Sequence, residues 1–176
     1  IGGYLFWCAQ SACGYPQTRR CGIIAPMSDI ILKLLLAYVI GSIMGSLLLG
    51  KMRHVDIRSM GSGNAGGTNA LRTQGKAFAL GVVIIDIGKG ALAAGWVPHL
   101  ALTSTEPTAA WLPFAFGAAA VVCHVYPIFH GFRGGKGAAT LVGTFLVLAP
   151  MSVLPLLAVL LLPIALTGFV GLATMV

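Results

Sequence analysis

Two glycine-rich polar segments contain the residues best suited to chemistry. The first runs from Gly61 to Asn69 and the second from Gly131 to Gly137. Each lies between segments apolar enough to cross a bilayer, so each can gather backbone N–H groups and cations at a membrane surface. Glycines let the backbone approach an oxyanion, and a nearby cation neutralises its charge. We therefore expect both segments to hold phosphate beside lipid.

Side chains in and beside both loops add hydrogen-bond donors and charge. The first loop carries donors and an arginine close to its glycines: Ser62, Gly63, Asn64, Gly66, Thr68, Asn69 and Arg72. The planar Arg72 guanidinium can hold phosphate bidentately. In the second loop Arg133 and Lys136 supply the cations. The simpler interpretation, that both loops are only tight turns, leaves this concentration of donors unexplained.

Two better-known phosphate motifs do not fit. Gly61, Gly63 and Gly66 match the dinucleotide fingerprint, and Asp86 follows about 20 residues later, but that motif needs a preceding strand in a soluble βαβ unit. The second loop is one residue short of a P-loop, and Gly137 follows Lys136 where Ser or Thr is required. A nucleoside triphosphatase or a nicotinamide enzyme is therefore not expected.

Three polar residues interrupt the apolar segments. Asp86 and Lys89 lie three apart on one face of a helix, where an isolated charge is unfavourable by several kcal/mol. Two interpretations stay open: a structural ion pair, or a Lys89 phosphate ligand that Asp86 positions. His124 could act as a base or donor near the second loop, or it could be a hydrogen-bonded packing residue.

Composition excludes several protein classes. The chain of 176 residues is 57% hydrophobic and 9% charged, which is typical of an integral membrane protein. Lys and Arg outnumber Asp and Glu by 11 to 4, but these cations lie in short loops between apolar segments, so nucleic-acid binding is not expected. The four cysteines, three of them before residue 22, fit no metal or disulfide pattern, so we expect no metal and no cofactor.

Apolar runs predict the elements that position the loops. Spans are expected at 30–50, 77–97 and 109–129, each long enough to cross about 30 Å of hydrocarbon. The uncharged stretch from Leu141 to Val176 exceeds one crossing, so a fourth helix ending near Leu166 and the start of a fifth are expected. The predicted class is an all-α, polytopic membrane helix bundle.

Loop charges predict the orientation. The loops 51–76 and 130–140 hold Lys and Arg, whereas the loop 98–108 holds none. Since cytoplasmic loops carry the excess of basic residues, both glycine-rich loops are expected in the cytoplasm. Residues 1–26 lack any periodicity and place Arg19 and Arg20 on the opposite side. They are interpreted as a non-native extension before Met27.

The combined motifs resemble the bacterial acyl-phosphate:glycerol-3-phosphate acyltransferase family (PlsY type). The resemblance covers residues 28–176 through three patterns: DIRxxGSGNxGxTNxxR from Asp56 to Arg72, DxxKG from Asp86 to Gly90, and HxxPxFxxFRGGKGxxT from His124 to Thr140. It implies transfer of a fatty acyl group from acyl phosphate to the 1-hydroxyl of glycerol 3-phosphate at the inner leaflet of the bacterial inner membrane. The product would be lysophosphatidic acid, for phospholipid synthesis.

The resemblance also implies roles for particular residues. Ser62 and Arg72 would be the critical residues of the first loop. Ser62 would either react itself or only donate a hydrogen bond, and we favour the hydrogen bond. The second loop would hold substrate through Gly134, Gly135, Lys136 and Gly137, within a motif that also contains His124, Arg133 and Thr140. The resemblance implies that the donor is acyl phosphate itself, which is already activated, so alignment and stabilisation of the departing phosphate would suffice.

The chain departs from the family pattern at three points. Gly67 replaces the usual Ala, and Arg133 replaces the usual Lys. Family members also continue past a segment like 167–172 into a third cytoplasmic motif, so residues 27–176 are interpreted as an acyltransferase domain without its C-terminal part. The competing hypotheses are a membrane carrier or channel for a phosphorylated solute, and a non-catalytic membrane scaffold.

Overall fold

The computed structural model describes residues 27–103 and 109–167. Every regular element in these residues is helical, which confirms the predicted all-α class. The predicted extension 1–26 and the predicted start of a fifth helix lie outside the described residues. The elements in chain order are α1 (Met27–Ser42), α2 (Gly45–Met52), η1 (Ile57–Ser59), α3 (Gly67–Gln74), α4 (Lys76–Gly95), η2 (Val97–His99), α5 (Leu112–Val125), η3 (Ile128–His130), α6 (Ala138–Leu148), η4 (Pro150–Ser152) and α7 (Val153–Thr167).

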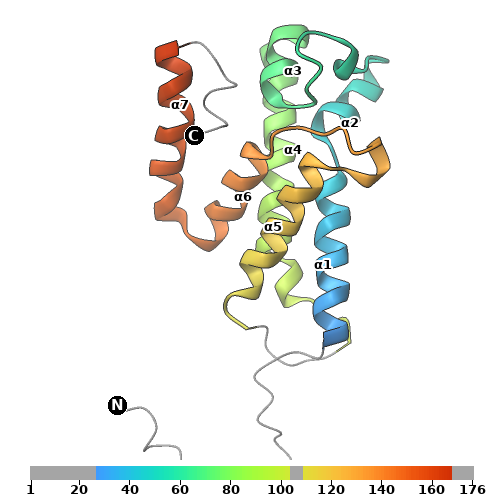
Figure 1. Cartoon of the computed structure of the whole chain (residues 1–176), viewed down its shortest axis with the longest axis vertical. Helices are drawn as coiled ribbons and strands as arrows, with labels where there is room; N and C mark the ends of the chain where they lie inside the picture. The colour runs from blue at the N-terminus through green and yellow to red at the C-terminus, as the bar shows by residue number, and fades with distance from the viewer. Residues whose placement is uncertain (1–26, 104–108, 168–176) are drawn as a thin grey trace, which may run out of the picture.

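The predicted second and third spans are present. The stretches Lys76–His99 and Leu112–His130 are each helical, apolar and long enough to cross a membrane. Their helical cores are α4, which runs through the length of the bundle, and the shorter α5, which lies beside its lower part (Figure 1). These two predictions are confirmed within a few residues at each end.

The first predicted span is not one continuous helix. It breaks at Ile43 and Met44, and the axes of α1 and α2 differ by 46°. The bent pair is apolar enough to count as one span. Hydropathy predicts the span correctly but carries no signal for this break, since the sequence there contains no proline.

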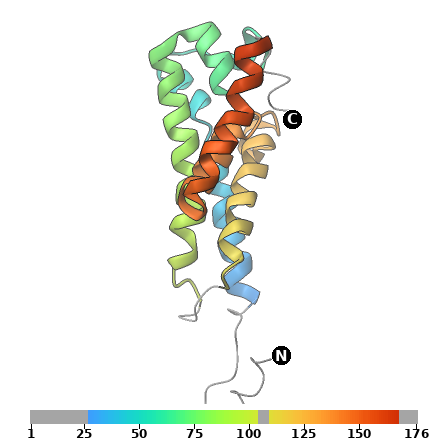
Figure 2. The same ribbon diagram turned by 90° about the vertical axis from the view of Figure 1, so that its left-hand side faces the viewer.

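The predicted fourth helix is wrong as a single element. The stretch forms two short helices, α6 and α7, separated by the η4 turn that begins at Pro150. Proline lacks the N–H that would continue α6, and its ring disfavours helical geometry at the residue before it, so Ala149 is non-helical, with φ of −150°. The two helices turn back on each other, and α7 lies at the edge of the bundle against α6 (Figures 1 and 2). By length and composition, the described residues hold two helices that could cross a membrane, and the bent pair of α1 and α2 would make a third span.

Helix α4 is the centre of the bundle. It packs against α6 and α5 and, along its length, against α1, α2 and α3. Close approach to α6 depends on glycine, because a Cβ on Gly90 would overlap the Thr140 carbonyl and a Cβ on Gly143 would overlap the Ile87 carbonyl. Small residues at such contacts are the usual means of tight helix packing in membranes.

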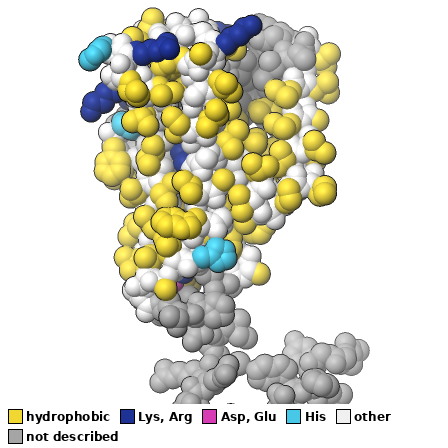
Figure 3. Space-filling view, turned by 180° about the vertical axis from the view of Figure 1, so that it is seen from behind, with side chains coloured by type: hydrophobic (Ala, Val, Ile, Leu, Met, Phe, Trp, Pro, Cys, Tyr) yellow, Lys and Arg dark blue, Asp and Glu magenta, His cyan; other side chains and the backbone are white. Residues whose placement is uncertain are grey.

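Both glycine-rich loops lie at the same end of the bundle. The first joins η1 to α3 and the second joins η3 to α6 (Figure 1). A buried cluster of Ile57, Ala70, Phe78, Ala79 and Val82 supports the first loop from below. The Lys and Arg side chains visible in Figure 3 gather mainly at this end, above a surface rich in hydrophobic side chains. The fold thus brings both loops to one end of the bundle.

Candidate functional site

Each glycine-rich loop ends where a helix begins. Gly66 precedes α3 and Gly137 precedes α6, and no side chain caps either helix start. Because the first N–H groups of a helix have no partner within it, both loops bring helix-start backbone donors to the same end of the molecule. Helix starts of this kind favour phosphate groups.

Asn69 shapes the first loop. Its Oδ1 accepts the Ser62 N–H at 3.0 Å, and its Nδ2 donates to the carbonyls of Ile57 at 2.9 Å and Met60 at 3.0 Å. Both amide hydrogens are therefore used, and the side chain is buried. The sequence predicted Asn69 as a phosphate ligand, whereas in the structure both of its side-chain N–H groups bond to the loop that it shapes.

The first loop needs glycine where it passes closest to Asn69. Gly61 has φ of 57°, and a Cβ there would overlap Oδ1 of Asn69. Gly63 has φ of 72° and is exposed. At the end of the loop, the buried Ser46 hydroxyl of α2 donates to the Ala65 carbonyl at 2.6 Å. The loop is thus held by side chains from α3 on one side and α2 on the other.

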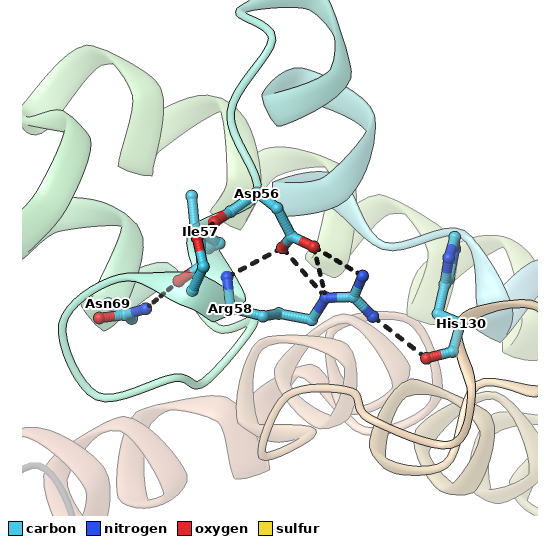
Figure 4. Close-up of polar contacts among 6 residues, drawn as sticks. Asp56, Ile57, Arg58, Asn69 and His130 are labelled. Atoms are coloured by element: carbon cyan, nitrogen blue, oxygen red, sulfur yellow. Dashed lines mark hydrogen bonds and ion pairs between the residues drawn. The ribbon is translucent and has the colours of Figure 1, made fainter.

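Arg58 connects the two loops. Its guanidinium pairs with Asp56 at 2.7 Å, and its Nη1 donates to the His130 carbonyl at 3.1 Å (Figure 4). The Arg58 side chain holds the pKa of the Asp56 carboxyl below its ordinary value of 3.8, and the same contact raises the pKa of Arg58. The pair is therefore fully ionised at neutral pH. It joins the turn before the first loop to the turn before the second.

The second loop is seated on His124. The Gly135 N–H donates to the His124 carbonyl at 3.1 Å, and a Cβ on Gly135 would overlap Nε2 of the ring. Gly134 is as tightly placed, because a Cβ there would overlap the same carbonyl and lie 2.7 Å from Cδ of Pro127. Glycine is required at both positions by packing, whatever the ligand. Gly137, with φ of 79°, turns the chain into α6.

His124 and its neighbours lie inside the bundle. Nδ1 of His124 is 3.2 Å from Oγ1 of Thr140 and 3.6 Å from Oδ1 of Asp86, and all three residues are buried. Lys89 Nζ contacts Asp86 at 3.1 Å, the Ile43 carbonyl at 2.7 Å and Sδ of Met44 at 3.9 Å. These contacts match the structural ion pair and the hydrogen-bonded histidine, which were the alternatives to direct phosphate contact.

The remaining predicted residues reach the surface. Asn64, Gly66, Thr68 and Gly134 are half-buried, and the exposed ones are Ser62, Gly63, Arg72, Arg133 and Lys136. Among the described residues, the Arg72 and Arg133 guanidinium groups make no hydrogen bond or ion pair. The buried Asn64 Oδ1 also has no partner there. Arg72 and Arg133 can therefore meet a ligand without first breaking a side-chain hydrogen bond or ion pair to the described residues.

Sequence reasoning missed the supporting residues. Asp56, Arg58 and Ser46 hold the loops but were not among the candidate site residues. The first two stand in the motif that opens the first loop, which was an available signal. Beside them an open hollow of about 380 Å³ is lined by Leu47, Lys51, His54, Val55, Asp56, Arg58 and His130. In the described residues no group of three His, Cys, Asp or Glu side chains could hold a metal ion.

Sequence comparison shows the family to which the chain is related. Residues 31–176 match the family model described as glycerol-3-phosphate acyltransferase. The glycerol-3-phosphate acyltransferase of Chlorobaculum parvum is 44% identical over 143 residues, which cover 77% of this chain and 61% of that protein. The protein of the same description from Bacillus velezensis is 44% identical over 147 residues, covering 83% and 72%. The chain spans about three-fifths of the Chlorobaculum parvum relative's length.

Solved structures give the same result. The crystal structure of PlsY (YgiH), an integral membrane glycerol 3-phosphate acyltransferase, in its glycerol 3-phosphate form superposes with a TM-score of 0.70 at 33% identity. That comparison covers 84% of this chain and 71% of the other. The lysophosphatidic acid form gives 0.67 at 32% identity. The predicted membrane helix bundle is thereby supported, and the chain belongs to the glycerol-3-phosphate acyltransferase family.

Proposed function

We propose that this protein transfers a fatty acyl group from acyl phosphate to the 1-hydroxyl of glycerol 3-phosphate, giving lysophosphatidic acid and inorganic phosphate for phospholipid synthesis. The observation that carries the proposal is that two glycine-rich loops lie at one end of a membrane bundle and are joined by the Arg58–His130 hydrogen bond. The reaction brings together two phosphate-bearing substrates, and each loop offers one cluster of donors.

The proposed chemistry needs little from the protein beyond alignment. The hydroxyl oxygen of glycerol 3-phosphate forms the new ester bond to the acyl carbon, and the phosphate leaves with the electron pair of the broken C–O bond. The hydroxyl proton goes to the departing phosphate, which is released as hydrogen phosphate. Since the mixed anhydride is already activated, no acyl–enzyme bond is required. The protein accelerates the reaction in two ways. It holds the hydroxyl against the acyl carbonyl, and it stabilises the charge of the departing phosphate.

The exposed residues of the two loops take the direct roles. Arg72 binds a phosphate through its planar fork, and Ser62 donates a hydrogen bond from its hydroxyl. Arg133 and Lys136 neutralise the second phosphate beside the N–H groups at the start of α6. Thr68, Asn64 and the backbone at Gly63 and Gly66 complete the first loop, and the backbone at Gly134, Gly135 and Gly137 completes the second.

The buried members of the predicted site act indirectly. Asn69 holds the first loop, His124 and Thr140 lie beneath the second, and Lys89 contacts the break between α1 and α2. Their donors already have partners in the protein, so we assign them to the support of the loops.

The proposed location is the cytoplasmic side of the bacterial inner membrane. The end with the two loops carries Lys51, Arg53, Lys76 and the loop cations, whereas the described part of the opposite end exposes His99 but no Lys or Arg. Basic residues favour the cytoplasmic side. Acyl phosphate would enter with its chain among the helices and its phosphate at the loops.

The test is direct reconstitution. Purified protein in lipid nanodiscs receives palmitoyl phosphate and radiolabelled glycerol 3-phosphate, and lysophosphatidate is the expected product. Palmitoyl-coenzyme A in place of palmitoyl phosphate is expected to give none. Flux of glycerol 3-phosphate into sealed liposomes without lysophosphatidate formation would overturn the proposal in favour of a carrier, and the absence of both reactions would favour a scaffold.

A further inference from the structure

The break in the first span leaves backbone groups that need partners. The chain leaves helical geometry at Ile43 and Met44, and a membrane interior offers no water to satisfy the groups released there. Two charged side chains of α4 supply the missing hydrogen-bond partners. Lys89 Nζ donates to the Ile43 carbonyl at 2.7 Å, and Asp86 Oδ1 accepts the Gly45 N–H at 3.3 Å. The ion pair is thus built into the break.

The two charges also match the two helix ends that they touch. The ammonium lies at the carbonyl end of α1, and the carboxylate lies at the N–H end of α2. Helix dipoles favour this arrangement and disfavour its reverse. Gly45 lets α2 approach α4 closely, since a Cβ there would lie 2.8 Å from the Val82 carbonyl. The start of α2 is therefore fixed against α4 by packing and by Asp86 together.

The position of α2 in turn sets the first glycine-rich loop. Ser46, the residue after Gly45, donates its hydroxyl to the Ala65 carbonyl at 2.6 Å. Both Ser46 and Ala65 are completely buried. A shift of the start of α2 would therefore move the end of the first loop, where α3 begins.

The same carboxylate faces the support of the second loop. Oδ1 of Asp86 is 3.6 Å from Nδ1 of His124. The His124 carbonyl accepts the Gly135 N–H, and the His124 ring packs against Gly135. The same ring contacts Thr140 in the first turn of α6. One buried oxygen atom thus contacts Gly45, Lys89 and His124, which belong to α2, α4 and α5.

We propose that Asp86 is a positioning residue that sets the separation of the two glycine-rich loops. It acts through α2 and Ser46 on the first loop and through His124 on the second. It touches no substrate in this scheme. The kinetic part of the inference rests on the proposed acyl transfer, whereas its structural part does not.

The chain provides a matched control for this role. Asp29 and Lys33 form a second buried ion pair at 2.8 Å, at the other end of α1. That pair contacts Thr103 and the Pro98 carbonyl, far from both loops. Asp29→Asn and Asp86→Asn therefore remove the same charge from similarly buried pairs, but only Asp86 is linked to the loops.

The experiment combines amide hydrogen exchange with kinetics in nanodiscs. Asp86→Asn is expected to speed exchange in both 61–67 and 131–137 by roughly 10-fold or more, and to lower kcat by roughly 10- to 100-fold. Asp29→Asn is expected to leave loop exchange and kcat unchanged, even where it lowers the unfolding temperature. Equal effects of the two variants, or unchanged loop exchange in Asp86→Asn, would overturn the inference.

Two further variants keep the test decisive. Should Asp86→Asn fail to fold, Asp86→Glu keeps the charge for Lys89 but displaces the carboxylate, and faster exchange in both loops is again expected. Ser46→Ala removes only the first link, so exchange should rise in 61–67 and not in 131–137. Wild-type exchange in both of these variants would overturn the inference. Absence of acyl transfer in the wild type, with the exchange pattern intact, would count against the proposed function alone.

Discussion

Replacing Gly135 by Ala tests whether the second loop is held by packing on His124. A Cβ at this position would overlap Nε2 of the His124 ring, whereas ordinary contacts begin at 3.4 Å. Either the ring or the loop must therefore move by about 1 Å. The ring is buried and its Nδ1 already contacts Thr140 at 3.2 Å, so we expect the loop to move.

The magnitude follows from this displacement. Inserting a methyl group into a closely packed site lowers the free energy of unfolding by about 1–3 kcal/mol. A displacement of about 1 Å in a group that aligns substrates can lower the rate roughly 100-fold. Gly135→Ala is thus expected to lower acyl transfer far more than its effect on stability would suggest.

The assay compares this variant with Gly88→Ala. Gly88 lies in α4, and a Cβ there would meet no atom within 4 Å, so the same substitution should be neutral or stabilise by about 0.5–1 kcal/mol. Lysophosphatidate formation and thermal unfolding are measured for both variants in the same nanodiscs. Wild-type kcat/KM and unfolding temperature in Gly135→Ala would refute the argument from packing.

Three further predictions concern the first loop. Arg72→Ala should lower acyl transfer by roughly 100-fold or more without lowering the unfolding temperature, because the side chain is exposed; turnover at the wild-type rate would contradict its role. Asn69→Ala removes three hydrogen bonds at about 1 kcal/mol each, so denaturant unfolding should show a free energy of unfolding that is lower by roughly 2–3 kcal/mol. A decrease below about 0.5 kcal/mol would contradict the role of Asn69 in holding the first loop. The pKa of Asp56 in the folded protein is below its ordinary value of 3.8. The stability that this carboxylate contributes is therefore present above the ordinary value and is lost as the pH falls through the lower, folded value. Between about pH 5 and 3 the unfolding temperature should therefore fall more in the wild type than in Asp56→Asn, and equal decreases would show that the pair with Arg58 contributes nothing.

The sequence alone determined the class of the protein and predicted the two loops of the candidate site. Apolar runs predict α4 and α5 because a helix that crosses lipid must be apolar over most of its length. The glycine-rich segments predict the two loops because glycines, polar donors and cations occur together there between apolar runs. Pro150 was visible too, although its effect on the fourth helix was underestimated: it ends α6 instead of interrupting a longer span.

Tertiary structure decided which polar groups support the loops and which remain for a ligand. Arg58 meets the His130 carbonyl across 72 residues of sequence, and Lys89 meets Ile43 across 46. Local spacing encodes neither contact, since each depends on how two separate helices pack. The break in the first span is also decided this way, because its released backbone groups are satisfied by Asp86 and Lys89 on another helix. A buried charge has to find its partner in space, and only the folded bundle shows where that partner lies.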